Sequence, residues 1–326
     1  MRLMEQARAL VGANAPAAAW PPARLSLALQ GGGSFGAFTW GVLDRLLEHD
    51  IAFDAVSGAS AGAVNAVLIA SGLLESRKEA QATLARFWRR MSDAAAFLPA
   101  ASLAASALGP GLSAFARALS PAQFNPFDLN PLREALAAEV DFERLRAGSP
   151  TKLLIAATKV RDGKSRIFRE QQLTVETVLA SACLPLIHHT VAIDGEPYWD
   201  GGYAANPPLI PLVQASDASH LLIVQVTPAK ATRLPTTPRE IAKRLDDIHF
   251  NATLNAELEA LKAGKILRAS PKLRRLRIGR ISAQDEFEGL EDENAGNLGR
   301  DFLERLRDSG RNATDVWIAQ AKATGR

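Results

Sequence analysis

Cysteine is nearly absent from the 326-residue sequence, which contains only Cys183. One cysteine cannot form an internal disulfide, and this favours a reducing compartment over an oxidising one. Cys183 lies in a run of small residues, so we expect a buried structural side chain, although His188 and His189 stand nearby as partners for a cysteine nucleophile. No His, Cys or carboxylate cluster in the sequence has the spacing of a metal site, and we expect neither a metal nor another cofactor.

Long apolar runs and a strong net charge are also missing. No run reaches the roughly 18 apolar residues that span a bilayer. The formal charge is +3, from 38 basic and 35 acidic residues, which excludes a polybasic nucleic-acid arm and leaves weak attraction to an anionic membrane. Residues 1–22 carry a trace of a signal-peptide pattern, but glycine, asparagine and proline interrupt its apolar part. We therefore expect a frayed tail over residues 1–22 and a cytoplasmic protein that can contact a membrane peripherally, with export as the alternative.

Apolar residues are plentiful, at 47% against 22% charged residues, and this balance predicts a globular chain with a substantial core. The pattern near the start predicts four elements: a strand at Leu25–Gln30, a helix at Gly36–His49, a strand at Ala55–Ser57 and an almost wholly apolar helix at Ala61–Ser71. Strand, helix, strand and helix within about fifty residues indicate an α/β fold, with a parallel sheet covered on both faces.

The same periodicities predict the later elements. Further strands are expected at Lys152–Val160, Val191–Trp199 (two extended pieces around an Asp194-Gly195 turn), His220–Val226 and Leu276–Ile281. Helices are expected at Ser76–Met91, Asn130–Ala138, Thr174–Ala182, Arg239–Leu267, Leu298–Leu306 and Ala313–Ala323. The acidic stretch Asp285–Asn297 is expected to be a solvated loop. We expect residues 23–326 to form one domain.

A glycine-rich motif, Gly31-Gly32-Gly33-Ser34-Phe35-Gly36, follows the first strand and opens the first helix. Glycines let the backbone approach a ligand closely, and N–H groups at a helix N-terminus stabilise negative charge. The motif also fits the G-x-G-x-x-G pattern of a dinucleotide site, which requires an acidic residue at the end of the second strand. Asp54 precedes that strand and Ser57-Gly58-Ala59-Ser60 occupies its end, so nucleotide binding is the lesser alternative.

The second motif, Gly58-Ala59-Ser60-Ala61-Gly62, matches G-x-S-x-G between a strand and a helix, as that pattern requires for a nucleophilic serine. An α/β-hydrolase would supply Asp and then His further along the chain, and His220 and His249 follow Asp200. The serine comes too early for that fold, however, and both histidines fall within predicted elements. With a glycine-rich loop one βα unit upstream, the motif predicts Ser60 as the nucleophile of a serine hydrolase.

Three motifs in order, GGGSFG, GASAG and the DGG of Asp200–Gly202, resemble the patatin-like phospholipase family over residues 25–225. The resemblance implies a three-layer α/β/α sandwich with a mainly parallel central sheet, related to the catalytic domain of cytosolic phospholipase A2. It also implies hydrolysis of lipid acyl esters by a Ser–Asp dyad that has no histidine. The partners would then be a lipid or acyl-ester substrate and a membrane surface, and no nucleic acid.

By this resemblance Ser60 is the nucleophile and Asp200 is the base, and the oxyanion hole consists of the backbone amides of Gly31, Gly32 and Gly33. We add the amide of Ala61 on the geometry of a helix N-terminus alone. A free aspartate has a pKa of about 4, a poor match for a serine hydroxyl, so the dyad requires burial of Asp200 among apolar walls to raise it.

One departure from the family concerns Phe35, which stands where the family's glycine loop usually carries Arg or Lys. Neutral glycerides, short acyl esters or a polyester-like chain fit an apolar Phe35 at least as well as phospholipid, and we expect Phe35 to contact the substrate. Residues 94–130, rich in Ala, Leu, Pro and Phe, are expected to form two short helices on the core or an apolar cap beside the active site. A non-catalytic lipid-binding or scaffold protein on the same fold is the alternative from another class.

Overall fold

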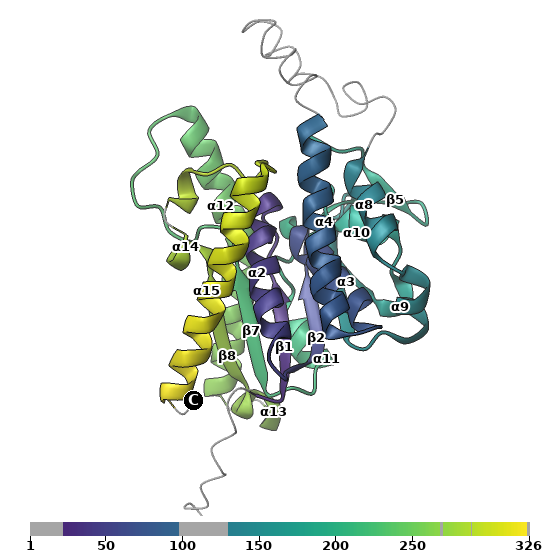
Figure 1. Ribbon diagram of the computed structural model, residues 1–326. Coiled ribbons are helices and arrows are strands. Elements are labelled where there is room, and N and C mark those ends of the chain that lie inside the picture. Colours follow the sequence, from purple (N-terminus) through teal and green to yellow (C-terminus); the bar gives the residue numbers. More distant parts are fainter. Residues whose placement is uncertain (1–21, 98–129, 268–269, 288, 325–326) are drawn as a thin grey trace, which may run out of the picture.

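The computed structural model of the chain describes residues 22–97, 130–267, 270–287 and 289–324 (Figure 1). Its strands are β1 (Arg24–Leu29), β2 (Ala52–Gly58), β3 (Lys152–Lys159), β4 (Ser165–Arg169), β5 (Val191–Ile193), β6 (Glu196–Asp200), β7 (His220–Gln225) and β8 (Arg277–Ser282). They form an eight-stranded sheet in the order β5-β6-β3-β2-β1-β7-β8, with β4 paired to β3. The run from β3 to β8 is parallel, whereas β4, β5 and β6 pair antiparallel. The predicted, mainly parallel sheet is confirmed.

The central strands are apolar on both faces because helices cover both. In β1, Leu27 and Leu29 join a cluster on one face while Ala28 joins the cluster on the other. In β7, Leu222 and Ile223 divide between the two clusters in the same way. A strand buried on both sides lacks polar alternation, which is why these segments are continuous apolar runs in the sequence.

Helices form the two outer layers. On one face lie α2 (Gly36–Leu47), α3 (Ala61–Leu73), α4 (Arg77–Phe97), α8 (Pro131–Glu139), α9 (Phe142–Gly148), α10 (Val175–Ser181) and α15 (Arg300–Thr324). The other face carries α11 (Leu209–Ala215), α12 (Pro238–Ile266) and α13 (Pro271–Arg275). Figure 1 shows α15 lying along α2, with α3 and α4 beside them. The fold is therefore the three-layer α/β/α sandwich that the resemblance implied.

Local sequence signals account for several element boundaries. Asn130 caps α8 by accepting hydrogen bonds from the amides of Leu132 and Arg133, and Thr174 caps α10. Asp194 and Gly195 both have positive φ, at 53° and 78°, and they form the tight turn between β5 and β6. The helices expected to begin at Asn130 and Thr174 and the turn expected at Asp194-Gly195 are thus confirmed.

The two predicted terminal helices are in fact one continuous helix, α15. The expected break fell at residues 307–312, which include Gly310. A Cβ on Gly310 would lie 2.1 Å from the carbonyl oxygen of Phe38 in α2. This glycine therefore permits close helix–helix packing, and it does not end the helix.

The stretch Asp285–Asn297 is only partly the solvated loop that its composition predicted. It contains the end of α14 (Ala283–Glu286) and a 3₁₀ turn, η4 (Leu290–Asp292), whose Leu290 is buried. The carbonyl of Ala295 accepts a hydrogen bond from the Ser34 amide at 2.8 Å. This segment therefore supports the glycine-rich loop, a contact between parts of the chain far apart in sequence.

Some predictions fall wholly or partly outside the described residues. These are the tail over residues 1–22, of which residues 1–21 are not described, and most of the segment 94–130, of which residues 94–97 belong to α4. None of the helices described in Figure 1 is both long and apolar enough to cross a membrane. Within the same residues no group of three or more His, Cys, Asp or Glu side chains is placed to hold a metal ion.

Candidate active site

The three motifs meet beyond the carboxyl ends of the parallel strands. The glycine-rich loop follows β1 and includes a 3₁₀ turn, η1 (Gly33–Phe35), while Ser60 follows β2 and begins α3. Asp200 ends β6, where it pairs with Ala157 near the carboxyl end of β3. Ligands of open α/β sheets bind at this edge, because the loops that follow parallel strands all converge there.

Ser60 occupies a strained elbow. Its φ and ψ are 53° and −127°, a conformation that is rare for a residue with a side chain. Backbone strain of this kind is concentrated at functional sites. Close backbone packing forces the turn, because a Cβ on Gly62 would lie 2.0 Å from the carbonyl oxygen of Leu29. The Ser60 amide donates to both the carbonyl and the hydroxyl oxygen of Ser181, each at 3.1 Å. The elbow is thus held from α3, β1 and α10, with Ser60 itself only 8% exposed.

The backbone of Asp200 is held as firmly as that of Ser60. Its amide donates to the Cys183 carbonyl at 2.8 Å, and its carbonyl accepts from the Thr158 hydroxyl at 2.7 Å. A Cβ on Gly201 would lie 2.1 Å from the carbonyl oxygen of Ala156, so the DGG turn packs directly on β3. The second residue of DGG therefore has to be glycine if Asp200 is to reach this position.

The Asp200 carboxyl is fully buried and incompletely hydrogen-bonded. Its Oδ1 accepts from the Gly202 amide at 2.7 Å, and Oδ2 has no hydrogen-bond partner of ordinary geometry among the described residues. Burial raises the pKa of Asp200 from 3.8 to about 7, against the opposing effects of the Ser60 hydroxyl and the Gly202 amide. The structure thus brings the predicted pair together, with an unused carboxylate oxygen and a pKa suited to a base.

The main-chain amides predicted for the oxyanion hole fall into two groups. The Gly31 amide donates to Asn206 Oδ1 at 2.7 Å inside the protein, so it is not free for a substrate. The prediction for Gly31 is corrected accordingly. No group in the described part of the chain accepts a hydrogen bond from the amides of Gly32, Gly33 or Ala61. These three remain available at the end of the sheet where Ser60 lies.

Phe35 was expected to contact the substrate, but its ring is part of the core. It is 3% exposed and packs edge-to-face on Phe302 of α15, with the ring centroids 6.3 Å apart. The ring therefore joins the glycine loop to α15 and has little exposed surface, although Phe35 also lines a cavity of about 670 Å³.

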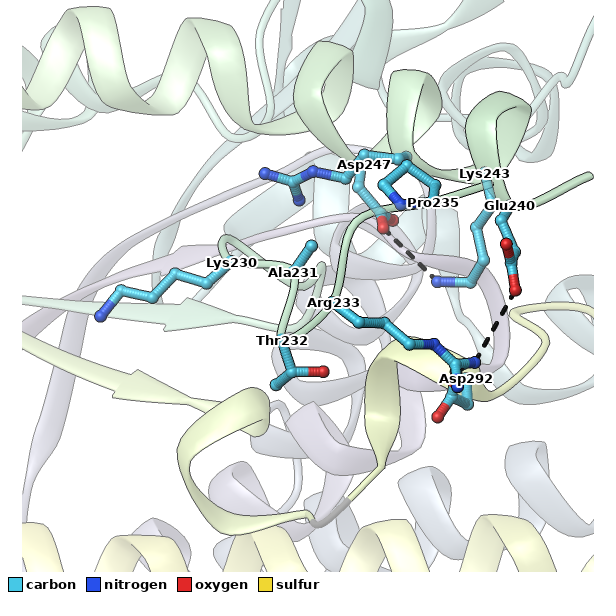
Figure 2. Close-up of a pocket in the computed structure, with 10 residues that line it drawn as sticks. Lys230, Ala231, Thr232, Arg233, Pro235, Glu240, Lys243, Asp247 and Asp292 are labelled. Atoms are coloured by element: carbon cyan, nitrogen blue, oxygen red, sulfur yellow. Dashed lines mark hydrogen bonds and ion pairs between the residues drawn. The ribbon is translucent and has the colours of Figure 1, made fainter. Parts of the chain in front are cut away.

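Charged side chains line two cavities beside this loop, of about 670 and 60 Å³. Figure 2 shows the smaller one, where Arg233 points toward Glu240 and Asp292. Arg233 pairs with Asp292 at 2.8 Å and with Glu240 at 3.8 Å, and Lys243 pairs with Asp247 at 3.4 Å. Arg233 and Lys243 are thus neutralised by neighbouring carboxylates, whereas Arg244, which lines the smaller cavity, donates to the carbonyls of Pro228 and Ala229.

The histidines and Cys183 do not take the place of Asp200. His220 begins β7 and so lies at the amino end of the sheet, opposite the three motifs. The ring of His249 packs edge-on to Tyr203, with centroids 5.5 Å apart, and no hydrogen bond recorded for the described residues joins it to Ser60 or Asp200. Cys183 is buried, and its Sγ donates to the His189 carbonyl at 3.1 Å. The structural interpretation of Cys183 therefore holds.

The sequence did not reveal three polar side chains that hold the site: Thr158, Ser181 and Asn206. Each lies in an apolar run or beside prolines, and each holds the site through a contact with a distant backbone group. No local sequence pattern predicts a contact between a side chain and a distant backbone group. Burial of an uncharged polar side chain within a few residues of a motif would have been the available signal.

Comparison with known proteins identifies the family. A family model described as patatin-like phospholipase matches residues 27–213. No curated protein matches the chain. Among solved structures it is similar to VipD from Legionella pneumophila, at 14% identity and a TM-score of 0.43, covering 91% of this chain and 66% of VipD, just under two thirds of its length. Because the family model covers more than half of the sequence and includes all three motifs, the chain belongs to the patatin-like phospholipase family.

Proposed function

We propose that this protein is a serine acyl hydrolase that cleaves carboxylic esters of lipids, with Ser60 as the nucleophile and Asp200 as the base. Its family is typically made up of lipid acyl hydrolases, which supports the general activity. The observation that carries the finer assignment is the fully buried Asp200 carboxyl, whose pKa is about 7, beside a serine on a strained elbow.

In the first half of the reaction, Ser60 Oγ attacks the ester carbonyl carbon while its proton passes to Asp200 Oδ2. That oxygen has no other hydrogen-bond partner among the described residues, so nothing competes for the proton. The carbonyl oxygen becomes negative and accepts hydrogen bonds from the amides of Gly32, Gly33 and Ala61. When the C–O bond to the alcohol breaks, the leaving oxygen takes the proton from Asp200, and the acyl group stays on Ser60.

Water completes the reaction. Asp200, again ionised, accepts a proton from the attacking water molecule, and the acyl carbon passes through a second oxyanion in the same cradle. Ser60 Oγ then leaves and takes the proton back. A base works best when its pKa is close to the operating pH, and burial brings that of Asp200 to about 7.

The preferred substrate in this proposal is a neutral lipid ester or a short acyl ester. Phe35 supplies no cation to the glycine loop, and the basic groups Arg233 and Lys243 nearby are paired with carboxylates. A phosphate-bearing head group would therefore find no uncompensated positive charge at these positions. We further propose a cytoplasmic location with peripheral contact to membranes, and no cofactor.

A fluorophosphonate probe, which forms a covalent bond with an activated serine, tests the proposal. We expect it to label the wild-type protein and Ser216→Ala, a change at the amino end of the sheet, but not Ser60→Ala. Hydrolysis of p-nitrophenyl esters of increasing acyl length, compared with labelled phospholipids, then ranks the substrates. Labelling that persists in Ser60→Ala would refute the nucleophile. Liposome binding without turnover would instead indicate a lipid-binding protein.

A further inference from the structure

The backbone of Gly31 is held on both sides by buried side chains, one on each of the two peptide groups that flank its Cα. Its N–H donates to Asn206 Oδ1 at 2.7 Å, and its carbonyl accepts from the Thr227 hydroxyl at 3.1 Å. Asn206 and Thr227 are 0% and 7% exposed. This clamp lies against the proposed nucleophile, because a Cβ on Gly31 would be 2.7 Å from Ser60 Cβ.

Asn206 is itself fixed in one orientation. Its Nδ2 donates to the Phe250 carbonyl at 3.0 Å, and its backbone amide donates to the Thr253 hydroxyl at 3.2 Å. Exchanging the oxygen and nitrogen of the side-chain amide would place a donor against the Gly31 amide and an acceptor against the Phe250 carbonyl. Both contacts would then be repulsive, so the acceptor oxygen has to face Gly31.

The other half of the clamp has its own support. Gln30 Oε1 accepts from the amides of Val226 and Thr227, both at 2.9 Å, and Gln30 Nε2 donates to Asn251 Oδ1 at 3.0 Å. Asn251 Nδ2 in turn donates to the Pro228 carbonyl at 3.1 Å. A buried network with its partners satisfied is rigid. The segment after β7 and the middle of α12 therefore fix Thr227, and through it Gly31.

We propose that Asn206 is a positioning residue, which fixes the backbone at Gly31 so that the amides of Gly32 and Gly33 face the reacting carbonyl oxygen. This inference rests on the proposed hydrolase function. Asn206 touches neither the substrate nor the reacting atoms, and its Nδ2 is already used by Phe250. It acts through Gly31. The Gly31 amide donates to Asn206 and so is not an oxyanion donor itself, but this bond fixes the backbone that carries the next two amides. Oxyanion donors work only when held at hydrogen-bond distance from the developing charge.

The test compares an ester with its thionoester, in which sulfur replaces the carbonyl oxygen. Sulfur is a poor hydrogen-bond acceptor, so turnover of the thionoester depends less on the oxyanion donors. For Asn206→Ala we expect kcat/KM for the ester to fall by about 10²-fold, similar to the loss of one oxyanion donor. The loss should be in kcat with KM little changed, and the ester-to-thionoester ratio of kcat/KM should fall about tenfold or more if the donors are displaced.

Two further variants make the result decisive. Thr227→Val is nearly isosteric and removes only the hydrogen bond to the Gly31 carbonyl. It should therefore lower the ester-to-thionoester ratio of kcat/KM by a smaller factor. If Asn206→Ala does not fold, the ratio in Thr227→Val tests the proposal. Ser216→Ala disturbs a buried hydrogen-bond network at the opposite end of the sheet and should leave the ratio unchanged.

Wild-type ratios in both Asn206→Ala and Thr227→Val would overturn the proposal. A wild-type protein that neither hydrolyses the ester nor takes up the fluorophosphonate would instead overturn the proposed function. The two failures are therefore distinguishable.

Discussion

Asp54 and Asp200 lie at opposite ends of the parallel sheet, Asp54 partly buried as a residue and Asp200 completely buried. The Asp54 side chain is 8% exposed, and Asp200 is 0% exposed. Asp54 sits in β2 at an irregularity in its pairing with β1, since the register passes from Phe53 directly to Ala55. The two aspartates thus differ both in how deeply they are buried and in what surrounds each carboxylate.

Asp54 has three contacts of the kind that stabilise an ionised carboxylate. Its Oδ2 accepts from the Ser216 hydroxyl at 2.7 Å and the Asp217 amide at 2.6 Å, and its Oδ1 accepts from Arg24 at 3.1 Å. Burial acts to raise the pKa of Asp54, but these hydrogen bonds, together with the charges of Lys152 and Arg24, outweigh it, and the pKa is lowered.

Asp200 has one hydrogen bond from a backbone amide and one nearby hydroxyl, and no cation in the described part of the chain shifts its pKa, so burial dominates and raises that pKa to about 7. In the folded protein Asp200 keeps its proton between pH 4 and 7, where the unfolded chain loses it, so its contribution to stability falls as pH rises through that window. Asp54 has the opposite sign, because its stabilising contribution is complete above the unfolded pKa of about 3.8 and is lost below it. Ionisation of Asp54, at the amino end of the sheet, therefore stabilises the folded state. Ionisation of Asp200, at the carboxyl end, destabilises it.

The largest expected effect is that of Asp200→Asn. The substitution removes the proton acceptor while preserving shape, so kcat/KM for esters should fall by about 10³-fold or more. At pH 8 the same variant should unfold at a higher temperature than wild type, because an ionised Asp200 costs on the order of 4 kcal/mol there. Ester hydrolysis and thermal unfolding at pH 8 measure the two changes. Retained activity, or a lower melting temperature, would contradict this account of Asp200.

The next effect is the pH dependence of the wild-type enzyme. Only ionised Asp200 can accept the serine proton, so kcat/KM should fall about tenfold for each pH unit below 7 and level off above it. The difference in unfolding free energy between wild type and Asp200→Asn should grow over the same range, from pH 4 to 7, and then stay constant. A kcat/KM that is flat from pH 5 to 8 would show that another group is the base.

The comparison also shows which parts of the molecule a sequence can predict. The strand and helix pattern around Ser60 was predictable because each element depends on residues within a few positions, and Asn130 and Thr174 capped the helices as expected. The roles of Ser60 and Asp200 came from three motifs taken in order, and they remain predictions until activity is measured. Their proximity in the structure is what those roles require.

The supporting contacts were not predictable, for a physical reason. The bonds from Gly31 to Asn206, from Thr227 to Gly31 and from Ser60 to Ser181 span 175, 196 and 121 residues. An uncharged polar side chain follows no periodic pattern, and its partner is a backbone group that every residue possesses. The same limit explains Phe35, because the pattern around it does not say whether its ring faces the substrate or α15.

The smallest expected effect on activity is that of Ser216→Ala, at the amino end of the sheet. Ser216 Oγ interacts with Ser26, donates to Asp54 and accepts from the Ala218 amide, so its loss leaves buried polar groups without partners. We expect a loss of about 1–3 kcal/mol in the free energy of unfolding, which lowers the melting temperature by about 2–4 °C per kcal/mol. Thermal unfolding and ester kinetics on the same sample provide both numbers.

The kinetics of Ser216→Ala test whether hydrogen bonds at the amino end of the sheet affect activity as those at the carboxyl end do. If the amino end contributes only stability, kcat/KM and its dependence on pH should match wild type, although this variant loses three side-chain hydrogen bonds and Asn206→Ala loses two. A fall in kcat comparable to that of Asn206→Ala would mean that any buried hydrogen bond, wherever it lies, sets the geometry of the active site. The effect of Asn206 would then belong to the rigidity of the whole sheet, and its contact with Gly31 would have no special part in holding the oxyanion donors.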